Sequence, residues 1–205
     1  PTHYSGIEVT GDDDLKGEGD RAAERLQFLI DGARVNHDAL VVDTPGSDSP
    51  LSQISHGAAD LLVTPVNDSF VDLDVLGHID AIKKQVLGPS HYSEMVLERR
   101  ADRVRQDRAP LDWFVVRNRI GTLDSHNARD VEWALKELAD HMKFHVLPGF
   151  SERVIFRELF LVGLTILDLK EASGGKSLSP SHIAAREEVW DLVSAILEKV
   201  KVPAL

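Results

Sequence analysis

Residues 39–46 constrain the fold more than any other segment of this chain. An apolar run, Ala39–Val42, ends in Asp43, and a Thr-Pro-Gly turn follows at once. A buried strand of a parallel sheet is typically a short continuous apolar run of this kind. Because open α/β sheets bind ligands beyond the carboxyl ends of their strands, Asp43 would stand where nucleotides bind. The segment predicts a strand at 39–42 and a ligand site at its end.

Strands and helices are predicted to alternate along the rest of the chain. Three more apolar runs are typical of strands: Leu61–Thr64, which ends at Pro65, then Trp113–Val116 and Phe144–Leu147. Apolar residues at helical spacing predict helices between them. The predicted helices cover about 20–33, 51–57, 70–87, 91–109, 131–142 and 180–200, the last with Ser179 as N-cap and Pro180 in its first turn. This alternation predicts an α/β fold with a mostly parallel sheet flanked by helices.

Composition limits the class of protein. The chain has 205 residues, of which 42% are hydrophobic and 28% charged, and this fits a single globular α/β domain over residues 1–205. The formal net charge of −11 disfavours non-specific binding to nucleic acid. The absence of cysteine excludes disulfides and thiol chemistry and fits a cytoplasmic protein. The longest apolar stretch is too short to span a membrane, so we expect no membrane partner.

Polar residues follow two further predicted strands. Asn67 and Asp68 come after the strand at 61–64, and Asn118 and Arg119 come after the strand at 113–116. The carboxyl ends of parallel strands lie at one edge of a sheet, so we expect these residues to gather with Asp43 at a nucleotide site. Ordinary turns, which also favour Asn and Asp, are the alternative.

The sequence holds no complete phosphate-binding loop. Gly174-Gly175-Lys176-Ser177 matches only the end of the motif G-x-x-x-x-G-K-[ST], because the first glycine of that motif falls on Lys170. A flexible connector before the Ser179 cap is the alternative to phosphate binding there. The chain also lacks G-x-G-x-x-G, which disfavours a dinucleotide-dependent oxidoreductase.

Other clusters allow more than one interpretation. His141 and His145 share a predicted helix face but lack the zincin glutamate, so helix-end histidines are the alternative to a metal site. The acidic run Asp12–Asp14 fits a solvated loop or a metal site. The arginines between positions 99 and 108 alternate with acidic residues, which fits a solvated helix face or a partner-binding surface.

The longer motifs resemble the ParA/MinD superfamily of deviant Walker A ATPases and, within it, the MipZ-type ATPases that position the division plane. The matching segments are DTPGSDS at 43–49, HGAADLLVTPVNDSFVDLDVLG at 56–77, DWFVVRNR at 112–119 and RVIFRELFLVGLTILDL at 153–169. The resemblance implies a P-loop NTPase-like fold in which this chain supplies the C-terminal three quarters. The first βαβ portion with its Walker A loop is missing, and since the chain starts at Pro1 without methionine we expect a fragment.

The resemblance implies that Asp43 is the Walker B aspartate, which acts on Mg²⁺ directly or through water. Thr44, Pro45 and Gly46 would form the switch segment that senses the γ-phosphate. Three further pairs match motifs around the base and the dimer face. They are Asn118 and Arg119, which would read adenine, Pro148 and Gly149, which would cover the base, and Asn67 and Asp68, in a signature loop near the nucleotide and the dimer face.

The implied function is ATP-dependent homodimerisation and slow ATP hydrolysis, with ATP or ADP and Mg²⁺ as cofactors. Relatives of this type bind the partitioning protein ParB and regulate FtsZ, and so couple chromosome partitioning to cell division at the nucleoid and the cell pole. Few positive charges follow Asn118, so we expect weaker non-specific DNA binding than in arginine-rich relatives. Without Walker A, this chain alone is expected to be inactive. The alternative is a non-catalytic binding module that acts only through protein partners.

Overall fold

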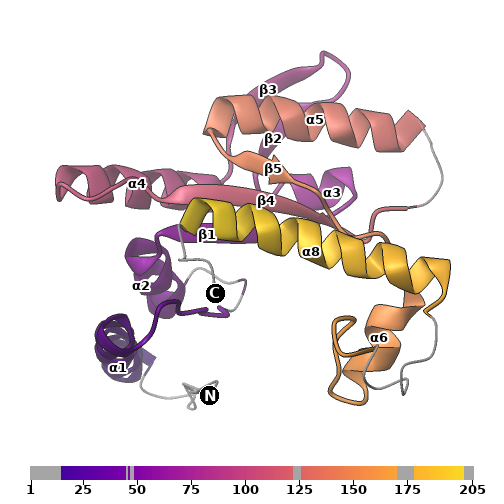
Figure 1. The fold of residues 1–205 in the computed structure, drawn as a ribbon. Coiled ribbons are helices and arrows are strands. Elements are labelled where there is room, and N and C mark those ends of the chain that lie inside the picture. Colours follow the sequence, from indigo (N-terminus) through magenta and orange to yellow (C-terminus); the bar gives the residue numbers. More distant parts are fainter. Residues whose placement is uncertain (1–14, 45, 47–48, 122–125, 170–177, 201–205) are drawn as a thin grey trace. The chain divides into compact units, whose positions relative to one another are not determined.

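A computed structural model describes residues 15–44, 46, 49–121, 126–169 and 178–200 of the protein (Figure 1). These residues form two compact units. The first unit holds the described residues up to Asp60 together with Met95–Leu111, and the second holds Leu61–Glu94 together with the described residues from Asp112. The assignment of the whole chain to one domain stays a prediction.

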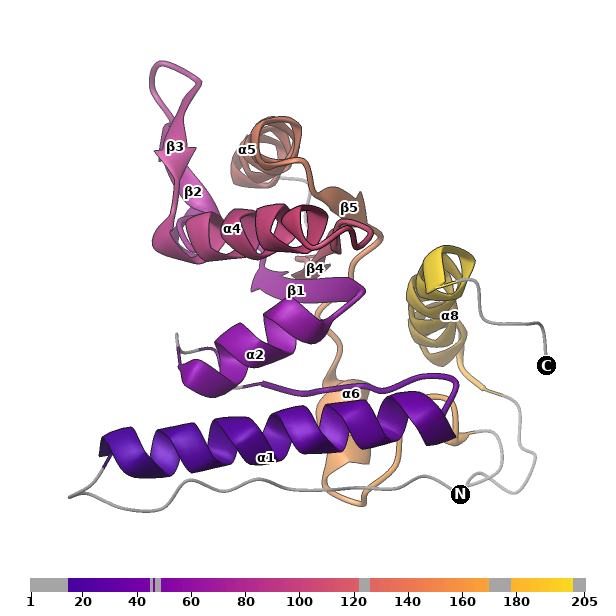
Figure 2. The same cartoon turned by 90° about the vertical axis from the view of Figure 1, so that its left-hand side faces the viewer.

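The first unit is helical. It contains α1 (Leu15–Asn36), α2 (Pro50–Ala58) and most of α4 (His91–Arg105). Helices α1 and α2 pack against each other (Figure 2). Ala22, Leu26 and Ile30 recur every four residues along α1 and are buried, as expected for an amphipathic helix. The predicted helices at 20–33 and 51–57 are confirmed, with longer bounds.

Helix α2 begins with a capping box. The backbone N–H of Ser52 donates to the Ser49 hydroxyl at 3.2 Å, and the backbone N–H of Ser49 donates to the Ser52 hydroxyl at 2.9 Å. Pro50 occupies the first turn, where its missing N–H costs no helical hydrogen bond. This cap fixes where the chain turns into α2 after the Asp43 segment.

The predicted strand at 39–42 is wrong. Residues 39–44 form neither helix nor strand, and Val41 is 91% exposed. A parallel strand requires a hydrogen-bonded neighbour on its edge and apolar cover on its faces. None of the described strand pairings includes these residues. An apolar composition alone therefore does not place these residues in a sheet.

The second unit is built on a parallel sheet in the order β1-β4-β5. Strand β1 (Leu61–Asn67) pairs with β4 (Asp112–Asn118) along its whole length, and β4 pairs with β5 (His145–Leu147). The three strands predicted here and the parallel α/β fold are confirmed. Strand β1 does not stop at Pro65, since a proline is tolerated at the edge of a sheet and β1 is an edge strand of the described sheet.

The predicted helix at 70–87 is also wrong. A single turn, α3 (Phe70–Leu73), is followed by an antiparallel hairpin of β2 (Gly77–Asp80) and β3 (Gln85–Pro89). Gly77 is buried, and a Cβ there would lie 2.9 Å from the backbone oxygen of Gly88 on β3 and 2.7 Å from Leu138 Cδ2 of α5 (His126–Met142), so the close approach of the β3 backbone favours glycine. In the turn, the Asp80 carboxylate accepts the backbone N–H groups of residues 82 and 83 at 3.1 and 2.9 Å.

Three further helices are described in the second unit: α5, α6 (Val154–Phe160) and α8 (Pro180–Val200). Helix α5 contacts α3, β3 and β5 (Figure 1). A separate small core joins Leu159 of α6, Ile166 and Ala185 of α8. The predicted α8 is confirmed, but of its predicted buried face Val189, Leu192, Val193 and Ile196 are only half-buried.

The core of the sheet centres on β4, where residues 113–116 are all buried. Trp113 Nε1 donates to Thr64 Oγ1 at 3.0 Å, and the Tyr92 hydroxyl lies 2.6 Å from the same oxygen. The Tyr92 ring meets Trp113 edge-on with 6.1 Å between centroids, and burial raises the pKa of Tyr92. The Thr64 hydroxyl on β1 thus forms hydrogen bonds with the polar groups of both Trp113 and Tyr92.

We expect Thr64→Val to lower the free energy of unfolding by about 1–3 kcal/mol, because the buried indole N–H and the Tyr92 hydroxyl lose their shared partner. Urea denaturation is the measurement. Thr64→Ser retains the hydroxyl and is the control. Equal stability of the Val and Ser variants would show that the hydrogen bonds contribute nothing net.

Candidate functional site

The carboxyl edge of the β1-β4-β5 sheet gathers six of the predicted site residues within the second unit. Asn67 and Asn118 are register partners at the ends of β1 and β4. Leu147, the last residue of β5, pairs with Val116, so the loop after β5 leaves the sheet at the same edge. The predicted grouping of Asn67, Asp68, Asn118, Arg119, Pro148 and Gly149 at one edge therefore follows from strand register.

A buried ion pair joins the first two strand ends. Arg117 donates through Nε and Nη2 to Asp68 Oδ1 at 2.9 and 2.5 Å, and the two side chains are 16% and 8% exposed. Asp68 is thus occupied by Arg117. Breaking such a pair on one side leaves an uncompensated charge that is only partly exposed to water. The pair thus links the residue that follows Asn67 to the residue that precedes Asn118.

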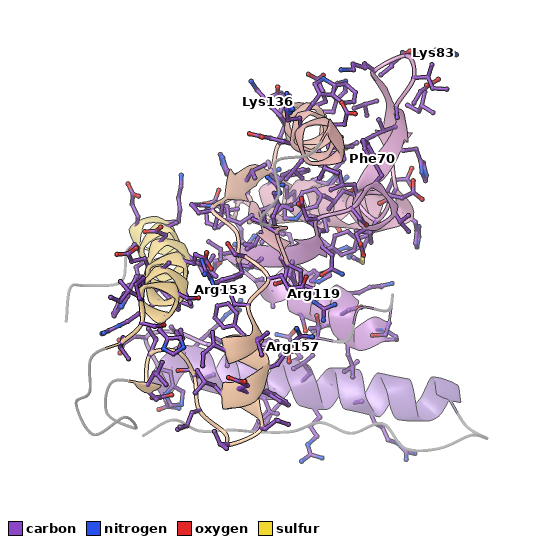
Figure 3. All side chains as sticks on the ribbon, turned by 90° about the vertical axis from the view of Figure 1, so that its right-hand side faces the viewer. Phe70, Lys83, Arg119, Lys136, Arg153 and Arg157 are labelled. Atoms are coloured by element: carbon purple, nitrogen blue, oxygen red, sulfur yellow. The ribbon has the colours of Figure 1, made fainter. Side chains whose placement is uncertain are left out.

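Asn118 sits at the start of a tight turn. Its side-chain Oδ1 accepts the backbone N–H of Arg119 at 3.0 Å, and Arg119 has φ 54° in the left-handed region. The side-chain amide N–H groups of Asn118 have no acceptor among the described residues, while the Arg119 side chain is exposed at this edge (Figure 3). This arrangement offers hydrogen-bond donors to a ligand from a side chain whose orientation is already fixed.

The loop after β5 packs directly onto this turn. The backbone N–H of Phe150 donates to Arg117 O at 2.8 Å, and that of Ile120 donates to Phe150 O at 2.9 Å. A Cβ on Gly149 would collide with Arg117 O and lie 2.7 Å from Ile120 Cδ1, so this close approach requires glycine. The Pro148-Gly149 loop therefore stands against the Asn118 turn.

Glu188 of α8 ties a helix to the same loop. Ser151 Oγ and Arg153 Nη2 donate to Glu188 Oε1 at 2.7 and 2.8 Å (Figure 3 labels Arg153). Burial opposes ionisation of Glu188, but the hydrogen bonds from Arg153 and Ser151 and the Arg153 charge outweigh it and hold the pKa of Glu188 below its usual value. Arg153 and Glu188 are 21% and 19% exposed, so solvent screens the pair only in part.

Asp43 and the predicted switch segment belong to the first unit. Asp43 is exposed, Thr44 is half-buried, and a Cβ on Gly46 would have open space around it. Pro45 lies outside the described residues. Searched over the part of the chain that the structure describes, no group of three or more His, Cys, Asp or Glu could hold a metal ion. Asp43 is thus a single exposed carboxylate outside any such group of described residues.

The signature loop after β1 is ordered by its own hydrogen bonds. Ser69 is the N-cap of α3 and donates through Oγ to Asp72 Oδ2 at 2.5 Å, while Asn67 Nδ2 donates to Asp72 Oδ1 at 3.4 Å. The Asp72 carboxylate thus accepts a hydrogen bond from Ser69 on one oxygen and from Asn67 on the other.

His141 and His145, which are expected to share a helix face, do not do so. Helix α5 ends at Met142, so His145 lies on β5, where its ring meets Phe114 with 5.6 Å between centroids. His141 Nδ1 hydrogen-bonds Glu137 O at 2.8 Å within the helix. That prediction was wrong because the chain turns at Lys143, which has φ 58°. The sequences 12–14 and 174–177 lie outside the described residues.

The sequence interpretation missed the partners that hold the site. It placed Asp68 near a ligand without its partner Arg117, and it gave no role to Glu188. The signal was present in part, since Arg117 follows a buried apolar run at the same strand end that carries Asp68. The sequence contains no such signal for Glu188, because its partners Ser151 and Arg153 lie far from it along the chain.

A family model described as ATPase MipZ matches residues 2–200. The chain belongs to the MipZ family. It is thus a ParA/MinD-like ATPase of the group that acts in cell division and chromosome partitioning. No curated protein matches the sequence. Over the residues that the structure describes, none of the helices has the length and apolarity of a membrane span.

We expect the Glu188 cluster to stabilise the MipZ-family fold in a pH-dependent way. A carboxyl whose folded pKa is depressed adds stability above its unfolded pKa, and that stability is lost as the pH falls through the folded pKa. Glu188→Gln should therefore lower the free energy of unfolding more at about pH 7 than at about pH 3. Glu187→Gln, at an exposed neighbour, is the control. An equal loss for Glu188→Gln at both pH values would contradict the assignment.

Proposed function

We propose that this MipZ-family chain reads the adenine of ATP at the carboxyl edge of its sheet. The observation that carries the proposal is the Asn118 turn, held by the Asp68–Arg117 pair on one side and by the Gly149 loop on the other. Adenine N1 is a hydrogen-bond acceptor, whereas N1 of guanine carries a hydrogen, and the amide N–H groups of Asn118 are donors without a protein acceptor in the described residues. A site discriminates best between two bases when its hydrogen-bonding groups are paired by the correct base and left unpaired by the wrong one.

Asp43 is proposed as the carboxylate that acts on Mg²⁺, with Thr44, Pro45 and Gly46 as the segment that senses the γ-phosphate. Magnesium is usually held by one or two carboxylates plus water and substrate phosphates, so one exposed carboxylate fits this role. The bound ion would neutralise charge on the phosphates. Asp43 would hold and orient it, while Asn67 and Asp68 would face the nucleotide or a second copy of the chain.

ATP-dependent homodimerisation and slow hydrolysis are the proposed cycle, which would act on a ParB-like partitioning protein and on FtsZ in the cytoplasm, at the nucleoid and the cell pole. Family membership supports this proposal. The 205 residues contain no complete phosphate-binding loop, so we expect them to hydrolyse no ATP by themselves. The net charge of −11 favours protein partners over non-specific DNA.

We expect Asn118→Ala to reduce the preference for ATP over GTP roughly tenfold or more, since the donors that meet adenine are removed. The measurement is competition of ATP and GTP for the intact protein with a phosphate-binding loop present. Asn36→Ala, the same change on the exposed end of α1, is the control. An unchanged ATP preference in Asn118→Ala would remove the adenine role from this turn.

We expect Asp43→Asn to slow Mg-dependent phosphate release by about tenfold or more and to weaken nucleotide-dependent dimerisation. Its effect on unfolding should be within about 0.5 kcal/mol, because the side chain is exposed. Phosphate release and sedimentation of the intact protein measure both effects, with the equally exposed Asp38→Asn as control. Wild-type hydrolysis by Asp43→Asn would exclude the metal role.

A further inference from the structure

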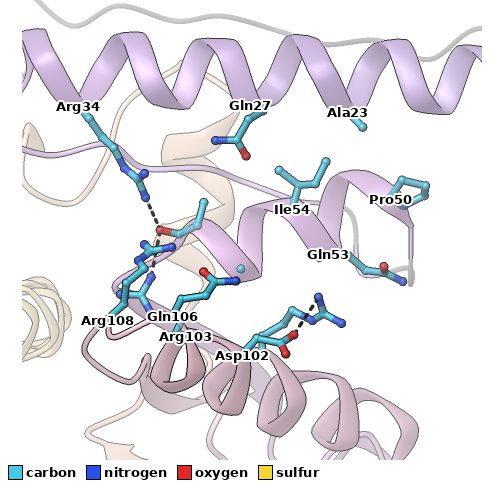
Figure 4. Close-up of a pocket in the computed structure, with 13 residues that line it drawn as sticks. Ala23, Gln27, Arg34, Pro50, Gln53, Ile54, Asp102, Arg103, Gln106 and Arg108 are labelled. Carbon is cyan, nitrogen blue, oxygen red and sulfur yellow. Dashed lines mark hydrogen bonds and ion pairs between the residues drawn. The ribbon is translucent and has the colours of Figure 1, made fainter.

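The first unit contains a pocket of about 440 Å³ lined by α1, α2, α4 and the turn after α4 (Figure 4). Four of its lining residues are Arg34, Arg99, Arg103 and Arg108, and Asp102 is the one carboxylate among the lining side chains. We call this cavity the arginine pocket. Its location differs from the Asn118 edge, because every lining residue belongs to the first unit.

Arg103 has a structural role. Its side chain is 4% exposed, and it donates to Asp60 Oδ1 at 2.7 Å and to Ala109 O at 2.9 Å. It also reaches Ala58 O at 3.4 Å, where Arg34 donates at 2.8 Å (Figure 4). Ala58 ends α2, so these two guanidinium groups stand at the negative end of a helix dipole. The arrangement accounts for the donors of Arg103 and for part of those of Arg34.

Arg99 is only partly satisfied. Its Nη1 and Nη2 lie 3.3 Å from Asp102 and 3.2 Å from Glu98, respectively. Its Nε–H, by contrast, is buried and has no hydrogen-bond acceptor among the described residues. A buried donor without a partner costs free energy.

Arg108 differs in its ion pairing from the other three arginines of the pocket. In the described part of the chain no carboxylate forms an ion pair with it, although its backbone N–H donates to Arg103 O at 2.9 Å. Burial lowers the pKa of Arg108, and the charges of Arg103 and Arg34 lower it further against the opposing charge of Asp60. At Arg108, therefore, the charges of the neighbouring Arg103 and Arg34 together outweigh the charge of Asp60.

We propose that the arginine pocket binds a small polyanion that carries phosphate or carboxylate groups. Guanidinium groups present paired N–H donors that match both kinds of oxyanion. The volume lies in the range of small-molecule sites, and the glutamines Gln27, Gln53 and Gln106 add neutral hydrogen-bonding groups to its wall. Arg108 is the lining arginine that forms no ion pair with a carboxylate of the described residues.

Calorimetric titration of the protein with pyrophosphate and with citrate, at matched ionic strength, tests the proposal. We expect saturable binding of at least one of them, and the tighter anion identifies phosphate or carboxylate as the preferred group. Arg108→Gln should weaken that binding roughly tenfold or more, since a charge-assisted contact is lost. Arg25→Gln removes the same charge from the exposed face of α1 and should leave the affinity unchanged.

Arginine Nε–H resonances of the wild-type protein give a second readout that does not depend on how Arg108→Gln folds. Addition of the anion should shift the signals of Arg34, Arg99 and Arg108. No saturable binding of either anion would overturn the proposal, as would equal affinity in Arg108→Gln and Arg25→Gln. Shifts confined to residues of the second unit would overturn it too, because they would place the anion at the Asn118 edge.

Discussion

The pairing of β1 with β4 is the constraint on which the second unit depends. All seven residues of Leu61–Asn67 are aligned with Asp112–Asn118, so one register sets both the core and the sheet edge. It places Thr64 where its hydroxyl meets Trp113, and it brings Asp68 beside Arg117. A slip by one residue would exchange the two faces of the strand and separate both pairs. The polar edge is therefore a direct result of how the apolar centre packs.

The Asp68–Arg117 pair is better understood as an orienting contact than as a source of stability. Removing two charges from water costs several kcal/mol per ion, roughly balanced by their attraction and hydrogen bonds. What the pair adds is geometry, since two donors to one carboxylate oxygen leave little freedom to the strand ends. Gly149 and Glu188 restrain the loop on the other side. The Asn118 turn lies between these restraints.

Local charge differs from net charge in this protein. The chain carries −11 overall, yet four arginines line one pocket beside a single lining carboxylate. The arginine-rich stretch of α4 is only in part the solvated helix face that its sequence allows. Arg99 and Arg105 pair with Asp102 along the helix, as a solvated face would, whereas Arg103 turns inward toward Asp60. Helical spacing predicts the first arrangement, and only packing produces the second.

Local sequence patterns predicted the three strands of the sheet, most helices, and the meeting of six residues at the carboxyl edge, whereas the place of Asp43 at that edge stays a prediction. Apolar runs followed by Asn67 or Asn118 were sufficient for this, because parallel strands end at a common edge. Tertiary structure alone decided that 39–42 is not a strand and that 77–89 is a hairpin. It also chose Arg117 as the partner of Asp68. Local patterns report how apolar a segment is, whereas strand pairing and ion pairing depend on neighbours that are distant in sequence.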